Sequence, residues 1–121
     1  MWEFFKDGGF VMWPILVFGV LTIAAAIRFA VKPGREKIGF IVAIGLTTLI
    51  AVLHGTVTDF GAVFGALANP TRVPDAQLTR TMWDGFQEAT RPGAFGGALL
   101  TLAAIAFSAG VLRLGGPEAK P

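Results

Sequence analysis

The sequence LTTLIAVLHGTVTDFGAVFGAL, residues 46–67, has the spacing of one long helix with two unlike faces. At about 100° per residue, bulky side chains fall on one face at alternating four- and three-residue steps: Leu46, Ile50, Leu53, Val57, Phe60, Phe64 and Leu67. A second face carries small or polar residues: Thr47, His54, Thr58, Gly61 and Gly65, flanked by Thr48, Gly55, Asp59, Ala62 and Ala66. In lipid, bulky residues can face acyl chains, whereas small and hydroxyl residues allow another helix to approach closely. We therefore expect the second face to meet protein or water.

The composition of the whole chain indicates a membrane protein. Hydrophobic residues make up 54% of the 121 residues and charged residues only 15%, and the mean hydropathy is +0.66. A net charge of +2 on so apolar a chain argues against a nucleic-acid-binding protein. Zero cysteines exclude a disulfide framework, a thiol nucleophile and thiolate metal ligands.

The first half of the chain predicts two membrane spans. Residues 1–9 mix aromatic and charged side chains, which is typical of a short segment at the headgroup level. Residues 10–31 are long enough to cross a bilayer core of about 30 Å, with Pro14 in the first turn. A cleaved secretory signal is the alternative for this start, although the preceding residues carry no net positive charge. After a tight basic turn around Pro33, the second span covers about residues 38–60, or extends to 67.

The second half predicts an amphipathic helix followed by a third span. The prolines of residues 68–74 indicate a loop, and Asp75 can cap a helix over about residues 75–90. Leu78, Met82, Phe86 and Ala89 share one face of that helix, opposite charged residues. Residues 91–93, Arg-Pro-Gly, kink or end it, and residues 94–114 form the third span. The expected fold is a single all-α membrane domain over residues 1–121 with three transmembrane helices.

The distribution of charge predicts an orientation. Three spans place the termini on opposite sides, and the side holding the turn around Pro33 carries six basic residues against two acidic ones: Arg28, Lys32, Arg35, Lys37, Arg113 and Lys120 against Glu36 and Glu118. The positive-inside rule makes this side cytoplasmic. We expect a multi-pass protein of a bacterial inner membrane, with its N-terminus outside and its C-terminus in the cytoplasm.

Three short motifs resemble the TolQ/ExbB/MotA proton-channel family, in family order on successive apolar segments. GGFVMWPI at residues 8–15 is similar to the start of that family's first helix, and HGTVTDF at residues 54–60 is similar to the signature of its second. GFQEA at residues 85–89, with Gly96 following, is similar to the approach to its third. The resemblance implies a ring of subunits, a pentamer in this family, around single-helix partners of the ExbD/TolR kind. It also implies proton flow that uses threonines of the ring and an aspartate of the partner.

The chain departs from the family pattern at three places. The large cytoplasmic region after the first helix is reduced to the turn around Pro33. Pro92 and Gly93 stand where the third helix of the family carries threonines, and Asp59 replaces the glycine that closes the second motif. These changes remove part of the expected hydroxyl pathway and add an acid. A structural or accessory subunit that docks onto a larger membrane complex without conducting protons therefore remains the alternative.

The candidate site follows from the same segment. An ionisable group near the bilayer is costly and usually faces a cavity or a partner, so a proton path would use Thr56, Thr58, Asp59 and His54. An Asp59 in the outer headgroup layer and a His54 used in packing are the simpler alternatives. Small residues predict the surface for helix packing or oligomers: Thr47, Gly55, Gly61, Gly65, Gly97 and Thr101. No constellation supports catalysis, a metal site or a cofactor site, so we expect a protein that is not an enzyme.

Overall fold

The structure is a computed structural model that describes residues 9–115. The described part contains four α-helices and one short 3₁₀ helix in the order α2 (Met12–Val31), α3 (Arg35–Leu67), η1 (Asp75–Gln77), α4 (Leu78–Ala89) and α5 (Arg91–Leu114). The expected all-α fold is confirmed for these residues, which form no strand. Most of the segment 1–9, expected at the headgroup level, lies outside the described residues.

Three of the helices are long and apolar enough to cross a membrane. They are α2 with 20 residues, α3 with 33 residues, and the continuous unit of η1, α4 and α5 over Asp75–Leu114. At 1.5 Å per residue, α2 is about 30 Å long, close to the hydrocarbon thickness of a bilayer. Large apolar side chains on all three are exposed, as at Val57 (70%) and Leu112 (77%). Such a surface is typical of a bundle solvated by lipid.

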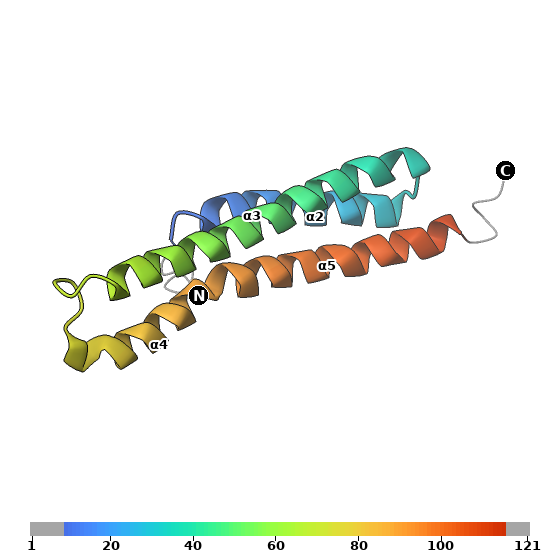
Figure 1. Ribbon diagram of the computed structural model, residues 1–121. Helices are drawn as coiled ribbons and strands as arrows, with labels where there is room; N and C mark the ends of the chain where they lie inside the picture. Colours follow the sequence, from blue (N-terminus) through green and yellow to red (C-terminus); the bar gives the residue numbers. More distant parts are fainter. Residues whose placement is uncertain (1–8, 116–121) are drawn as a thin grey trace.

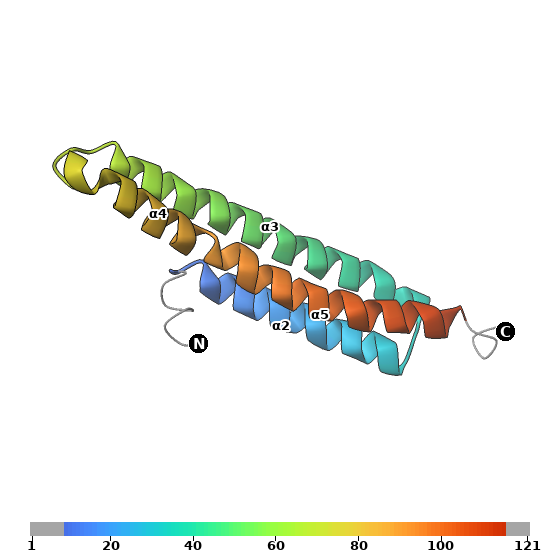
Figure 2. The ribbon, with the colours of Figure 1, turned by 90° about the horizontal axis from the view of Figure 1, so that it is seen from below.

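The three long helices lie side by side, with α2 and α5 running parallel and α3 antiparallel to both (Figures 1 and 2). Gly9 precedes α2 with a φ of +76°, a conformation that glycine adopts without a steric penalty. Pro33 and Gly34 separate α2 from α3, and the Nζ of Lys37 donates to the backbone oxygen of Lys32 at 2.7 Å across this turn.

The side chain of Asn69 stabilises the loop between α3 and η1. The Oδ1 of Asn69 accepts hydrogen bonds from the backbone N–H and the hydroxyl of Thr71, at 3.0 Å and 2.6 Å. Val73, within this loop, is buried. This arrangement returns the chain toward α3, so that α4 packs along the last turns of α3 (Figure 2).

Only Thr90 separates α4 from α5, and Pro92 lies in the first turn of α5. Proline is tolerated there because its missing N–H has no partner inside the helix. The break between the amphipathic helix and the third long helix therefore falls before the proline, and α5 begins three residues earlier than the expected residue 94. The outer part of α3 and all of α4 extend past the start of α2 (Figure 1).

The core is formed by apolar side chains that enter gaps above glycines of a neighbouring helix. A Cβ built on Gly96 of α5 would lie 2.1 Å from Val52 of α3, and one on Gly19 of α2 would lie 2.4 Å from Leu99 of α5. Gly110 receives the ring of Phe29 in the same way. Phe29, which is fully buried, also stacks on Phe107 with ring centroids 5.4 Å apart. These contacts hold the three helices at short distances, as small residues do in membrane bundles.

Candidate functional site

The small and polar face of α3 divides into two parts in the folded chain. Thr48 and Gly55 are buried against α2: a Cβ on Gly55 would lie 2.0 Å from Val11, just before that helix. Five other members, Thr47, His54, Thr58, Gly61 and Gly65, are exposed. We call these five residues the exposed α3 stripe. The bulky face beside it is exposed at Leu46, Ile50, Leu53 and Val57, so along this stretch neither the stripe nor the bulky face packs within the chain.

The stripe has open space around its glycines. Nothing lies within 4 Å of a Cβ built on Gly61 or Gly65. The hydroxyl of Thr47 donates to the backbone oxygen of Ala43 at 2.9 Å. On α5, Gly97 also has nothing within 4 Å of a built Cβ, and exposed Thr101 donates to its backbone oxygen at 2.7 Å. Gly55 alone among the glycines predicted for helix packing makes its close contact inside the chain.

The four residues predicted for a proton path do not converge within one chain. Thr56 is half-buried and faces α5, where a Cβ on Gly93 would lie 3.7 Å from its hydroxyl. Thr58 and His54 are exposed on the α3 stripe. The hydroxyl of Thr56 donates to the backbone oxygen of Val52 at 2.9 Å, and that of Thr58 donates to the backbone oxygen of His54 at 2.8 Å. Each hydroxyl proton is therefore engaged by its own helix.

Asp59 lies at the end of the bundle where α2 begins. It is half-buried and lines a cavity of about 150 Å³ with Gly9, Val63 of α3, and Gly85 and Glu88 of α4. Because Gly9 lines the same cavity, Asp59 lies near the level of the segment that precedes α2. Both alternatives for Asp59, a proton path and the headgroup layer, stay predictions.

A second, larger cavity of about 340 Å³ adjoins the first between α3 and α4. It is lined by Ala62, Val63 and Ala66 on one side and by Thr81, Asp84, Gly85 and Glu88 on the other. Val63 sits over Gly85, where a built Cβ would lie 2.8 Å from its side chain. Among residues 9–115, no group of three or more His, Cys, Asp or Glu side chains is placed to hold a metal ion.

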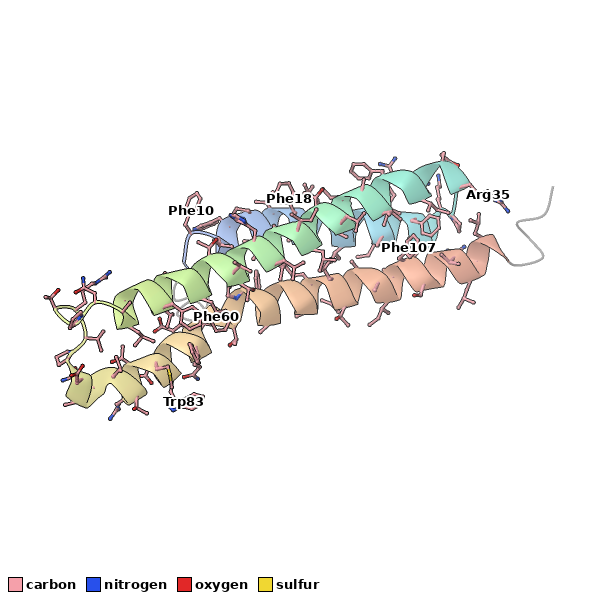
Figure 3. All side chains as sticks on the ribbon, viewed as in Figure 1. Phe10, Phe18, Arg35, Phe60, Trp83 and Phe107 are labelled. Atoms are coloured by element: carbon pink, nitrogen blue, oxygen red, sulfur yellow. The ribbon has the colours of Figure 1, made fainter. Side chains whose placement is uncertain are left out.

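An aromatic cluster closes the opposite side of the α3–α4 contact. The ring of Phe86 lies 5.5 Å from that of Phe60, 5.7 Å from that of Phe64 and 6.1 Å from that of Trp83, measured between centroids. Phe60 points from α3 toward α4, whereas Trp83 lies on the outer side of α4 (Figure 3). The predicted apolar face of the amphipathic helix thus contributes Phe86 to this cluster and Ala89, which is buried, to the contact beside it.

Sequence reasoning missed a buried polar contact between two threonines. The hydroxyls of Thr22 in α2 and Thr48 in α3 lie 3.0 Å apart in the centre of the bundle, and both residues are buried. A hydroxyl inside an otherwise apolar span is the signal that could have identified Thr22, since hydroxyls in membrane helices often bond across helices.

Comparison with known proteins identifies no relative: no family model, no curated protein and no solved structure matches this chain.

Proposed function

We propose that this chain is a subunit of a membrane-embedded homo-oligomeric ring, similar to the TolQ, ExbB and MotA proteins, and that it is not an enzyme. The observation that carries the proposal is the exposed α3 stripe. Five small or polar residues lie in a line on the exposed surface of α3, next to exposed bulky residues such as Ile50 and Val57. Contact with lipid does not require small or polar residues in a line, whereas contact with a second copy does, because small residues let the two helix backbones approach closely.

The distribution of charge at the two ends of the bundle supports the proposed membrane orientation. The end formed by the last turn of α2, the first turn of α3 and the last turn of α5 holds Arg28, Lys32, Arg35, Lys37 and Arg113 against Glu36. The positive-inside rule places this end in the cytoplasm and the α3–α4 end outside. In a bacterial inner membrane the N-terminus is then external and the C-terminus cytoplasmic.

Membrane insertion and ring assembly have separate tests. An integral protein stays with membranes after alkaline carbonate extraction, and release into the supernatant would contradict insertion. Particle images in nanodiscs then count subunits about an axis, with five expected from the family resemblance. Gly61→Leu fills the open space on the α3 stripe without touching the chain's own core and should reduce the ring to monomers. Ala24→Leu on the exposed surface of α2 is the matched control and should leave the ring intact.

We further propose that the ring conducts protons. In a ring, Thr58 and His54 of one copy would face the next, and Asp59 would lie at the outer mouth of the path. Asp59→Asn should abolish a proton flux into reconstituted vesicles, whereas Asp84→Asn, an exposed acid on α4, should not. A flux unchanged by Asp59→Asn would contradict the assignment of Asp59.

A structural or accessory role is the second candidate, and the hydroxyl geometry favours it. Because Thr56 and Thr58 donate to their own helix and lie on different faces of α3, one chain holds no continuous hydroxyl path. A parent protein that assembles but carries no flux would support this role. A single-helix partner with an intramembrane aspartate that purifies with the chain would instead support a proton motor.

A further inference from the structure

An apolar groove of about 160 Å³ lies where α2, α3 and α5 meet, in the half of the bundle near the basic end. Its lining includes Thr22 of α2, Ile41 and Gly45 of α3, and Ala103, Ala104 and Phe107 of α5. The groove exists because Gly45, Ala103 and Ala104 have very small side chains or none. Ala103 is buried at its base and Ala104 is exposed at its edge, so the groove is open on the surface of the bundle.

The groove offers almost no hydrogen bonds to a ligand. Thr22 supplies the hydroxyl, which already lies 2.7 Å from the backbone oxygen of Phe18 and 3.0 Å from the hydroxyl of Thr48. An apolar cavity of about 150 Å³ stays dry and accepts a six-carbon hydrocarbon such as benzene. The groove therefore fits a segment of about six methylene groups better than it fits water.

The adjacent end of the bundle is strongly basic. Five cationic residues and one acidic residue lie on the last turns of α2 and α5, in the connection after α2 and on the first turn of α3: Arg28, Lys32, Arg35, Lys37 and Arg113 against Glu36. Lys37 precedes Ile41 by four residues and so lies on the same side of α3 as the groove. Its Nζ donates one hydrogen bond to Lys32 and retains its charge and two further donors.

The spacing between charge and groove matches one lipid leaflet. Ile41 is about 9 Å along α3 from Arg35, and Gly45 is about 15 Å from it, at 1.5 Å per residue. Half of a bilayer core is about 15 Å thick. A phosphate held at the level of Arg35 and Lys37 would place its acyl chain alongside Ile41, Gly45 and Phe107.

We propose that this groove and the basic end above it form a binding site for one anionic phospholipid of the cytoplasmic leaflet. The acyl chain lies in the groove, and the phosphate contacts Lys37, which lies on the groove side of α3. The excess of cations selects an anionic headgroup over a zwitterionic one. This inference rests on the proposed membrane insertion and orientation, but not on ring assembly or proton conduction.

Native mass spectrometry of the full chain in detergent tests the site, with equal amounts of phosphatidylglycerol and phosphatidylcholine added. We expect one tightly retained phosphatidylglycerol per chain. Lys37→Gln should weaken its retention about fivefold, since one cation near an anionic surface contributes about 1 kcal/mol. Arg80→Gln at the opposite end should leave retention unchanged. Equal retention of the two lipids would overturn the proposal.

A second variant tests the groove itself. Ala104→Leu fills the groove from its exposed edge and should remove the retained lipid, while Ala109→Leu, an exposed change on the same helix outside the groove, should not. Both should keep the helical circular dichroism of the parent. A folded Ala104→Leu protein that retains phosphatidylglycerol would overturn the proposal, as would full competition by glycerol phosphate, which lacks acyl chains. Failure of membrane insertion is scored separately by carbonate extraction.

Discussion

The hydroxyl of Thr22 in α2 lies 3.0 Å from the hydroxyl of Thr48 in α3, and each threonine also bonds a carbonyl of its own helix. Each hydroxyl has one proton, so only one of the two threonines can donate to the other. When the two hydroxyls bond each other, either Thr48 donates to Thr22, which donates to the backbone oxygen of Phe18 at 2.7 Å or of Ile44 at 3.4 Å, or Thr22 donates to Thr48, which donates to Ile44. In each of these arrangements at least one bond joins the helices, and every hydroxyl proton has an acceptor.

This bond predicts a small but measurable coupling between the two threonines. Thr22→Val and Thr48→Val should each destabilise the protein modestly, because the remaining threonine keeps a carbonyl acceptor in its own helix. The double-mutant cycle should give a coupling free energy of about 0.6 kcal/mol, the average for such bonds in membrane helices. Detergent-induced unfolding measures it. The pair Thr47→Val and Thr48→Val is the control, since Thr47 is exposed and should show no coupling.

The glycines of α5 predict opposite effects at neighbouring positions. Gly96→Ala should destabilise the chain by about 2 kcal/mol, because its Cβ would lie 2.1 Å from Val52 and 3.3 Å from Ile15. Gly97→Ala should be neutral or stabilising, because nothing lies within 4 Å and alanine favours helix. Thermal unfolding of the two proteins compares them directly. Val52→Ala in the Gly96→Ala background should recover part of the loss, and equal effects at both glycines would contradict this packing.

Hydrophobic length and helical periodicity predicted the number and type of the long helices, since these depend on local sequence alone. They could not predict how far each helix is rotated about its axis. That rotation decides that Gly55 faces Val11 while Gly61 faces open space. It also decides that Thr48 is buried and Thr47 is exposed. Each pair looked equivalent in the sequence because all four residues lie on the small half of the helix.

For the same reason, the sequence could not predict which neighbours the residues of the candidate proton path would face. The spacing of Thr56 and Thr58 is two residues, which on a helix turns their side chains about 200° apart. The structure agrees, with Thr56 facing Gly93 of α5 and Thr58 exposed. A path using both would need contributions from neighbouring chains, and the sequence of one chain does not specify them.

Arg113 at the end of α5 predicts a stabilising contact with the end of α2. Its Nη1 donates to the backbone oxygens of Ala30 and of Val31, the latter at 3.0 Å. These carbonyls have no partner within the helix, and a cation there also complements the helix dipole. Arg113→Ala should therefore lower the unfolding free energy by about 1 kcal/mol, and Arg113→Lys by less. Arg80→Ala, exposed at the other end, should change it by under about 0.5 kcal/mol.

The aromatic cluster predicts local opening of α4 when Phe86 is removed. Within the described residues, α4 is held to α3 largely by Phe86, whose ring contacts Phe60 and Phe64, and by Val63 over Gly85. Aromatic pairs contribute about 0.5–1.5 kcal/mol each beyond their buried area, so Phe86→Ala should cost the α3–α4 contact about 2 kcal/mol or more. The core formed by α2, α3 and α5 is separate from this contact and should keep its stability.

Hydrogen exchange resolves these two regions. In Phe86→Ala, amides of α4 should exchange about 30-fold faster, the factor that corresponds to about 2 kcal/mol, while amides of α5 near Gly96 and Gly110 stay protected. Gln87→Ala, an exposed change at the next position, is the control and should leave both regions unchanged. Equal acceleration along α4 and α5 would contradict the separation, because it would mean that the α3–α4 hairpin and the three-helix core open as one unit.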